Sequence, residues 1–422
     1  MTDQNLTAQN PTRQRFIILA VLLIGIMVAY LDRVNVSVLA ANEIFLNDMG
    51  IKGQPIQIGM MMSTFLIAYG VANLTLSPLG DYFGPRKAML ASVVLWCVAL
   101  SVGGIAGSFA VLIASRIILG IGEGFYYPMQ GLLVKNWFPG QERGRANAAW
   151  IIGQSLGPAL AMPIFAYVIV TFGWRESFHA ATFLTLIPLY LLWFHTADTP
   201  REHKKVNALE LQHIESGLDQ SKATVKETLL QRIKPFISNY RYWLLVYWYV
   251  SLNFMFWGFV SWLPSYLKSA RGFSWGEMGW MASLPFILAI VSKAVTGWAI
   301  DRTGRSAPFL FAAMFFGGLG VYWAAVVPGK YEAAILLALA FAVCNMAAPA
   351  AWTLLQGLVP TKSLSTAGGI MNGVTAILSS ISPVLIGFVI SMTGNYANGL
   401  FLLVGAGMLA AGVAAILVVQ KY

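Results

Sequence analysis

The stretch SPLGDYFGPRK, residues 77–87, has a counterpart in GWAIDRTGRS, residues 297–306. Each contains an aspartate followed three residues later by a glycine, and the two aspartates, Asp81 and Asp301, are 220 positions apart. The same offset separates two further pairs of residues, Gly153 from Gly373 and Pro163 from Pro383. An offset that is kept over so much of the chain indicates an internal duplication.

Both stretches are typical of tight turns between helices. A glycine permits the turn, and an aspartate at a helix end can pair with a neighbouring cation or cap a helix N-terminus. We expect such contacts to latch one conformation of the protein. The candidate latch residues are Asp81, Gly84, Arg86, Asp301, Gly304 and Arg305.

The composition indicates a membrane protein. Of the 422 residues, 58% are hydrophobic and 10% are charged, whereas about 25% of the residues in a soluble domain are charged. Apolar runs of about 18 residues or more recur along the chain, which is typical of membrane-spanning helices. A β-barrel would instead have short segments in which apolar and polar residues alternate. The expected fold class is therefore all-α and integral to the membrane.

Twelve apolar runs are expected to span the membrane. Their approximate positions are 16–40, 56–79, 86–106, 109–134, 143–170, 175–194, 239–267, 274–300, 306–327, 331–356, 364–391 and 395–419. In the long polar segment after the sixth run, Leu211, Ile214 and Leu218 fall on one face of a short surface helix. We expect an N-terminal six-helix half at 1–194, a cytoplasmic linker at 195–238 and a C-terminal six-helix half at 239–422.

The distribution of positive charge predicts the orientation. With the N-terminus inside, the inner loops and tails hold 19 Lys and Arg residues and the outer loops hold five. This asymmetry predicts that both termini are cytoplasmic. It also explains the net charge of +10 without a nucleic acid as partner, because the basic residues are spread over short loops and form no stripe.

Four ionisable residues lie inside the runs, Asp32 and Arg33 in the first and Arg116 and Glu123 in the fourth. A charge at mid-membrane costs about 2.5–3.5 kcal/mol on insertion scales. Structural pairing of Asp32 or Glu123 with Arg116 is one explanation. However, one arginine cannot neutralise two carboxylates at once, which favours protonation of at least one acid. Adjacent helical residues point about 100° apart, so we expect Asp32 to face Arg116 and Arg33 to face a central cavity.

The two turn stretches resemble the signature loop of the major facilitator superfamily, although Ser77 replaces the usual leading glycine of the first copy. Two copies at matching positions favour this resemblance over simple tight turns with flanking basic residues. YLDRVNVSVLA (30–40), RIILGIGEGFYYP (116–128) and NWFPGQERGRANA (136–148) are similar to its anion:cation symporter family. The resemblance covers essentially the whole chain. It implies two pseudo-symmetric six-helix halves that move a carboxylated substrate together with protons or another cation.

The resemblance also implies roles for single residues. It assigns Asp32 and Glu123 to proton coupling and Arg33 to the substrate carboxylate, which a planar guanidinium binds with two hydrogen bonds. The residues that it implies around the central site are Tyr30, Tyr69, Gln154, Trp352 and Asn372. In the alternative interpretation, the aromatic residues pack or anchor the interface, and the amides hold helices together.

Three features of the remaining spans have two interpretations each. Asn253, Trp257 and Ser261 share one helical face, which either lines the central site or packs against a neighbour. Lys293 either extends to the inner surface, which we expect, or binds a second acidic group of the substrate. The stretch GQSLGPALAMP, 153–163, partly resembles a glycine/proline motif of antiporters, and close helix packing explains its glycines equally well.

Together these features predict a proton-coupled importer of a small organic anion, such as a sugar acid. We expect a monomer in the plasma membrane of a bacterium, with the anion, protons and the lipid bilayer as partners, working by alternating access. An antiporter or exporter of the same fold is the alternative. An enzyme is not expected, because no nucleophile–base pair, metal-ligand spacing or phosphate loop is evident. A receptor without transport is disfavoured by the acids in the first and fourth runs. No cofactor, metal or disulfide is expected, since Cys97 and Cys344 lie alone in separate runs.

Overall fold

The computed structural model describes residues 10–77, 79–216, 229–360 and 363–420. These residues form helices and connecting turns, and no strand occurs among them. Twelve stretches of helix within them are long and apolar enough to cross a membrane, which confirms the predicted number of spans. Apolar periodicity and length were therefore sufficient to find the spans, because each has to cover the hydrocarbon thickness by itself.

The first six spans are built from seven helices. These are α1 (Gln14–Leu39), α3 (Pro55–Leu76), α5 (Pro85–Gly104), α6 (Phe109–Trp137), α7 (Arg143–Ile151) with α8 (Gly153–Phe172), and α9 (Trp174–His195). The short helices α2 (Glu43–Asp48) and α4 (Leu79–Phe83) lie in the connections after α1 and α3. Within this half, α3 and α5 pack on α6, while α1 packs on α8 and α9.

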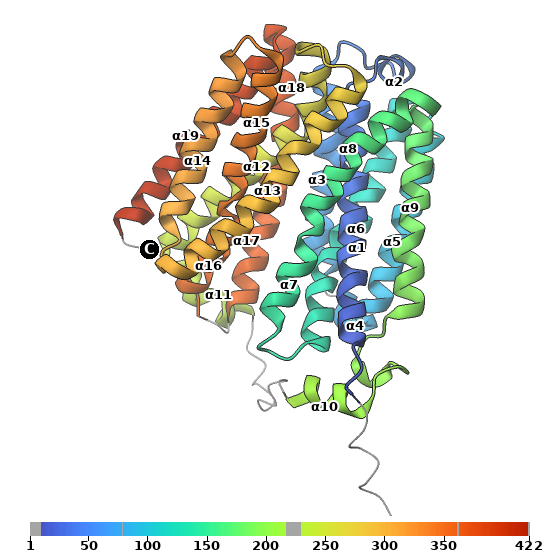
Figure 1. Cartoon of the computed structure of the whole chain (residues 1–422), viewed down its shortest axis with the longest axis vertical. Coiled ribbons are helices and arrows are strands. Elements are labelled where there is room, and N and C mark those ends of the chain that lie inside the picture. The colour runs from blue at the N-terminus through green and yellow to red at the C-terminus, as the bar shows by residue number, and fades with distance from the viewer. Residues whose placement is uncertain (1–9, 78, 217–228, 361–362, 421–422) are drawn as a thin grey trace, which may run out of the picture.

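The last six spans are interrupted more often. They are α12 (Tyr240–Ser265) with a π-helical turn (Tyr266–Ala270), α13 (Trp275–Thr303), α14 (Ala307–Val326), α15 (Lys330–Asn345) with α16 (Ala347–Leu358), α17 (Leu364–Ser379) with α18 (Ser382–Thr393), and α19 (Tyr396–Val419). Here α14 packs on α15 and α19, and α12 packs on α17 and α19. Figure 1 shows the two halves side by side, coloured blue to green and yellow to red.

Three sets of helices join the halves. They are α3 with α17 and α18, α8 with α13, and α1 with α12. The α3–α18 contact is close because Gly59 lacks a side chain. A Cβ at Gly59 would lie 2.9 Å from the Cα of Val384, a separation that real Cβ atoms essentially never show. This site thus lets the two halves approach backbone to backbone.

The first part of the segment between the halves packs against the first half, whereas its helix α11 (Leu229–Ile237) contacts α12 and α17 of the second half. Its helix α10 (Ala208–Ser216) confirms the predicted surface helix, although Leu218 lies outside the described residues. Glu210 of α10 is fully buried and accepts hydrogen bonds from the backbone N–H groups of Gln14 and Arg15 (both 3.1 Å). It therefore caps the N-terminus of α1, whose own N-cap residue gives no side-chain cap.

Figure 1 places α10 at the end of the molecule opposite α2, and these ends are called the α10 end and the α2 end below. At the α10 end, α7 packs mainly on α1, α6 and α8, while α16 packs mainly on α12, α13 and α14. Each of these two helices thus packs mainly within its own half. Trp352 on α16 is 38% exposed.

Candidate functional site

The C-terminal part of α1 is buried on all sides by protein, which keeps its charged residues away from lipid. Residues 31–40 are all buried, since α1 lies against α8, α9, α12, α6 and α7. Asp32 is 0% and Arg33 2% exposed. On α6, Arg116 and Glu123 are each 1% exposed. These four side chains are called the buried charge cluster below.

Glu123 pairs with Arg33. The Nε–H of Arg33 donates a hydrogen bond to Oε2 of Glu123, and the other carboxylate oxygen has no hydrogen-bond partner in the protein. The structure thus differs from the pairing of Glu123 with Arg116 that was one explanation of these charges. Arg116 and Glu123 are seven residues, about 10 Å, apart along α6. The neighbouring helix α1 instead brings the closer cation.

Asp32 points toward the sixth span. Its Oδ2 lies 3.2 Å from the hydroxyl of Thr185 on α9, and its Oδ1 has no hydrogen-bond partner. The expected contact of Asp32 with Arg116 is therefore not formed, because the rotation of α1 turns Asp32 toward α9. Thr185 was missed by the sequence analysis. In the sequence Thr185 is simply one hydroxyl residue in an apolar span. Such hydroxyls commonly donate a hydrogen bond to a carbonyl oxygen of their own helix. The hydroxyl of Thr185 also lies 2.9 Å from the carbonyl oxygen of Ala181.

Arg116 has no carboxylate partner within 4 Å among the described residues. Its Nε donates to the carbonyl oxygen of Met61 (3.3 Å), and its guanidinium lies 4.9 Å from the centre of the Phe65 ring. Both terminal nitrogens are buried without a hydrogen bond. Unpaired buried charge is costly, so this cluster is not optimised for stability alone.

Aromatic rings surround the guanidinium of Arg33. Its Cζ lies 4.2 Å from the ring centre of Tyr30, 4.7 Å from Tyr69, 5.4 Å from Phe65 and 5.9 Å from Trp257. Tyr30 stacks on Trp257 of the second half at 6.3 Å and 25°. Cations are attracted to such ring faces. Arg33 therefore lies where the two halves meet.

The remaining predicted lining residues are more dispersed. Gln154 donates to the hydroxyl of Tyr127 (3.3 Å), and Asn253 donates to the carbonyl of Tyr249 on its own helix (3.0 Å). Trp352 meets the ring of Tyr249 edge-on at 6.1 Å. Asn372 is partly buried on α17. The sequence analysis missed Tyr127 and Tyr249, since tyrosines in spans are also common at membrane interfaces.

The glycines of the stretch 153–163, which partly resembles an antiporter motif, have a packing explanation. A Cβ at Gly157 would lie 3.0 Å from the Cβ of Tyr30, and one at Gly153 would lie 2.8 Å from the carbonyl oxygen of Leu23. These glycines thus bring α8 close to α1. Close packing of α8 on α1 therefore accounts for these glycines without antiport.

The turn at residues 77–87, the first copy of the expected latch, is held by Asp198, a residue that the sequence analysis missed. The backbone N–H of Arg86 donates to Asp198 Oδ1 (2.7 Å), and its side chain donates to the carbonyl oxygens of Leu192 and Trp193. Gly84 is at φ +85°, and a Cβ there would lie 2.7 Å from the carboxylate of Asp198. This turn is thus tied to the end of α9.

The second copy is more open. Gly304 ends α13 in the left-handed region at φ +66°, as a glycine C-cap does. Arg305 is exposed. The side chains of Asp81 and Asp301 lie outside the described residues.

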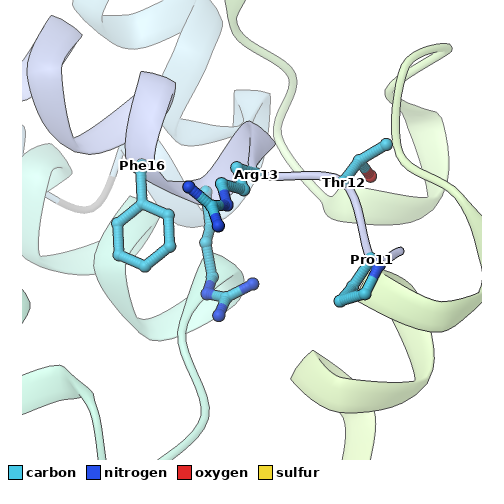
Figure 2. Close-up of a pocket in the computed structure, with 5 residues that line it drawn as sticks. Pro11, Thr12, Arg13 and Phe16 are labelled. Carbon is cyan, nitrogen blue, oxygen red and sulfur yellow. The ribbon is translucent and has the colours of Figure 1, made fainter.

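A hollow of about 630 Å³ lies at the start of α1, far from the buried charge cluster. Figure 2 shows Pro11, Thr12, Arg13 and Phe16 around it, and Arg15 completes its lining. Phe16 and Asp32 are separated by about 24 Å along α1. This hollow is thus a feature of the α10 end and not part of the central site.

Comparisons with known proteins agree with this architecture. The family model described as Major Facilitator Superfamily matches residues 22–383. A probable sulfoacetate transporter of Cupriavidus necator is 31% identical over 91% of this chain and 89% of its own length. A probable galactarate/D-glucarate transporter of Bacillus subtilis is 28% identical over 96% of this chain and 91% of its own length.

Among solved structures, a bacterial homologue of the lysosomal transporter Spinster, inward-facing and unoccupied, has a TM-score of 0.79 and 15% identity. The match covers 96% of this chain and 97% of that one, and it supports the fold. The matched family, the relatives and the twelve spans confirm the resemblance seen in the sequence. The chain belongs to the major facilitator superfamily and is a membrane transporter, not an enzyme.

Proposed function

We propose that this protein imports a small organic anion together with protons. The observation that carries the proposal is the buried ion pair between Arg33 and Glu123. In this pair the carboxylate of Glu123 binds the guanidinium of Arg33, to which the carboxylate of the substrate would also bind. Substrate and Glu123 therefore compete for one cation, and a proton on Glu123 decides the competition.

The names of the relatives support an anionic substrate. Besides sulfoacetate and galactarate/D-glucarate, they include a D-galactonate transporter of Escherichia coli and a hexuronate transporter of Bacillus subtilis. All of these compounds carry an acidic group. An arginine enclosed by Tyr30, Tyr69 and Trp257 offers such a substrate a charged anchor and apolar surfaces.

The cycle follows from the cost of burying charge. When Glu123 is protonated, Arg33 is released and attracts the substrate carboxylate. The substrate carboxylate then balances the positive charge of Arg33, and the two halves can rock about the loaded site. After the substrate leaves on the other side, Glu123 loses its proton and pairs with Arg33 again. A site with substrate but no proton, or the reverse, leaves an uncompensated buried charge that costs several kcal/mol.

Asp32 and Arg116 complete the proposal. Asp32 is the second proton carrier, and Arg116 supplies the positive potential that both acids share. Gln154, Asn253, Trp352 and Asn372 contact the uncharged parts of the substrate.

The orientation and the organisation of the chain belong to the same proposal. We assign the α10 end to the cytoplasm of a bacterial cell, with both termini inside and the protein working as a monomer. The two halves are 1–194 and 239–422, and the segment 195–238 joins them. The turns around Gly84 and Gly304 latch the cytoplasmic ends, with Asp81 and Asp301 as their acids.

Proton movement in liposomes tests the direction of coupling. The purified protein is reconstituted without a gradient, and D-glucarate, D-galactonate or sulfoacetate is added outside. Symport makes the outside more alkaline as proton and anion enter together. Acidification of the outside would indicate proton exchange and support the antiporter. Absence of flux for every anion tested would contradict the proposal.

A further inference from the structure

Lys293 on α13 is a third cation within the spans, and it lies where α13 of the second half meets α8 of the first. Its Nζ donates a hydrogen bond to the hydroxyl of Ser155 on α8 (3.1 Å). Among the described residues it has no carboxylate within 4 Å. Asp301 is eight residues, or about 12 Å, further along α13. Lys293 therefore contacts the other half of the protein. This corrects the expectation that its side chain extends to the inner surface.

The charges in the middle of the spans do not balance. Arg33, Arg116 and Lys293 are cations, whereas Asp32 and Glu123 are the acids that accompany them. The hydroxyl of Ser155 accepts one hydrogen bond from the ammonium group of Lys293 but does not neutralise its positive charge. Among the described residues this leaves one excess positive charge when both acids are ionised and two when Glu123 alone is protonated, which is the state that binds the substrate in the proposed cycle. A substrate with two negative charges would then restore neutrality, whereas a monoanion would leave one positive charge.

The level of Lys293 relative to Arg33 follows from the packing of α8 on α1. Gly153 of α8 lies against Ile26, and Gly157 lies against Tyr30. Ser155 is therefore level with about residue 28 of α1, some five residues or 7.5 Å from Arg33. Tyr30 occupies a level between them. Arg33 lies against Tyr30 and Trp257, and Lys293 bonds to a side chain that is about 7.5 Å nearer the α10 end along α1.

We propose that Lys293 binds the second acidic group of a substrate that carries one acidic group at each end, while Arg33 binds the first. This inference rests on the proposed import of an organic anion and names its class, a linear dianion. An extended chain advances roughly 3.5 Å per three bonds. About six bonds therefore cover the offset along the helices, as in a six-carbon diacid.

The test compares ligands that differ only in the second acidic group. D-glucarate and D-gluconate share a six-carbon polyhydroxy chain and differ in whether its far end carries a carboxylate. Binding to the purified protein is measured by calorimetry for the wild type, Lys293→Met and Lys87→Met. Lys87 is an exposed lysine at the α10 end and serves as the matched control.

The wild type and Lys87→Met are expected to bind the dianion about 10-fold or more tightly than its matched monoanion, as the loss of a charged hydrogen bond predicts. Lys293→Met should lose this preference and keep its affinity for the monoanion. Equal weakening of both ligands, or a wild type without a preference for D-glucarate over D-gluconate, would overturn the inference. If Lys293→Met does not fold, the wild-type ratios and Lys293→Gln decide. If the wild type binds none of these anions, the proposed function itself fails.

Discussion

Replacing Arg33 by lysine tests whether the site requires the planar guanidinium group of arginine or only its positive charge. Lysine keeps one positive charge but lacks the planar fork that gives two parallel hydrogen bonds to a carboxylate. It also lacks the Nε–H that binds Glu123 and the flat group that lies 4.2 Å from the Tyr30 ring. The substitution therefore removes at least one charged hydrogen bond to the substrate.

The expected magnitude follows from that bond. A hydrogen bond to a charged group contributes about 1.5–3 kcal/mol, so Arg33→Lys should weaken anion binding by about 10- to 150-fold. Calorimetry with the anion found in the flux assay measures the effect. The matched control is Arg175→Lys, because Arg175 also lies over an aromatic ring, at 4.1 Å from Trp174, and pairs with an acid at the exposed α2 end. Unchanged binding by Arg33→Lys, or an equal loss in the control, would refute the assigned role of Arg33.

Two further predictions concern the α10 end. Glu210→Gln should lower the apparent unfolding temperature and speed hydrogen exchange at Gln14 and Arg15, because the amide binds the N-terminus of α1 less strongly. The neighbouring change Glu215→Gln, at an exposed ion pair, should do neither. Burial lowers the pKa of His203 below its ordinary value of 6.5, so the unfolded chain binds the proton more readily. The contribution of His203 to stability should be complete above about pH 6.5 and fall below it. Thermal unfolding between pH 5.5 and 7.5 should therefore be less pH-dependent in His203→Gln, and an unchanged profile would contradict this origin.

The spans were predictable because lipid imposes a length and an apolar composition on each of them. The expected first span at 16–40, for example, corresponds to Gln14–Leu39. The internal duplication could also be found in the sequence, because the aspartate and the glycine of the first turn both recur 220 positions later in the second turn. Neither property requires knowledge of how one helix is rotated against another.

The pairing inside the site was not predictable in the same way. Whether Arg33 or Arg116 contacts Glu123 depends on the rotation and tilt of α1 and α6, and a sequence periodicity constrains these only to a broad face. Thr185 and Asp198 were missed for a related reason. Each acts on a residue far away in the sequence, and a single polar residue in or beside a span gives no sign of its partner.

Substitution of Glu123 by glutamine tests the central claim most directly. Glutamine resembles the protonated acid and cannot carry a proton through the cycle. In liposomes, Glu123→Gln should exchange labelled anion across the membrane but fail to accumulate it when the outside is acidic. Glu43→Gln, an exposed acid at the α2 end, should accumulate the anion as the wild type does. Accumulation by Glu123→Gln at the wild-type level would contradict the claim that protonation of Glu123 frees Arg33 for the substrate.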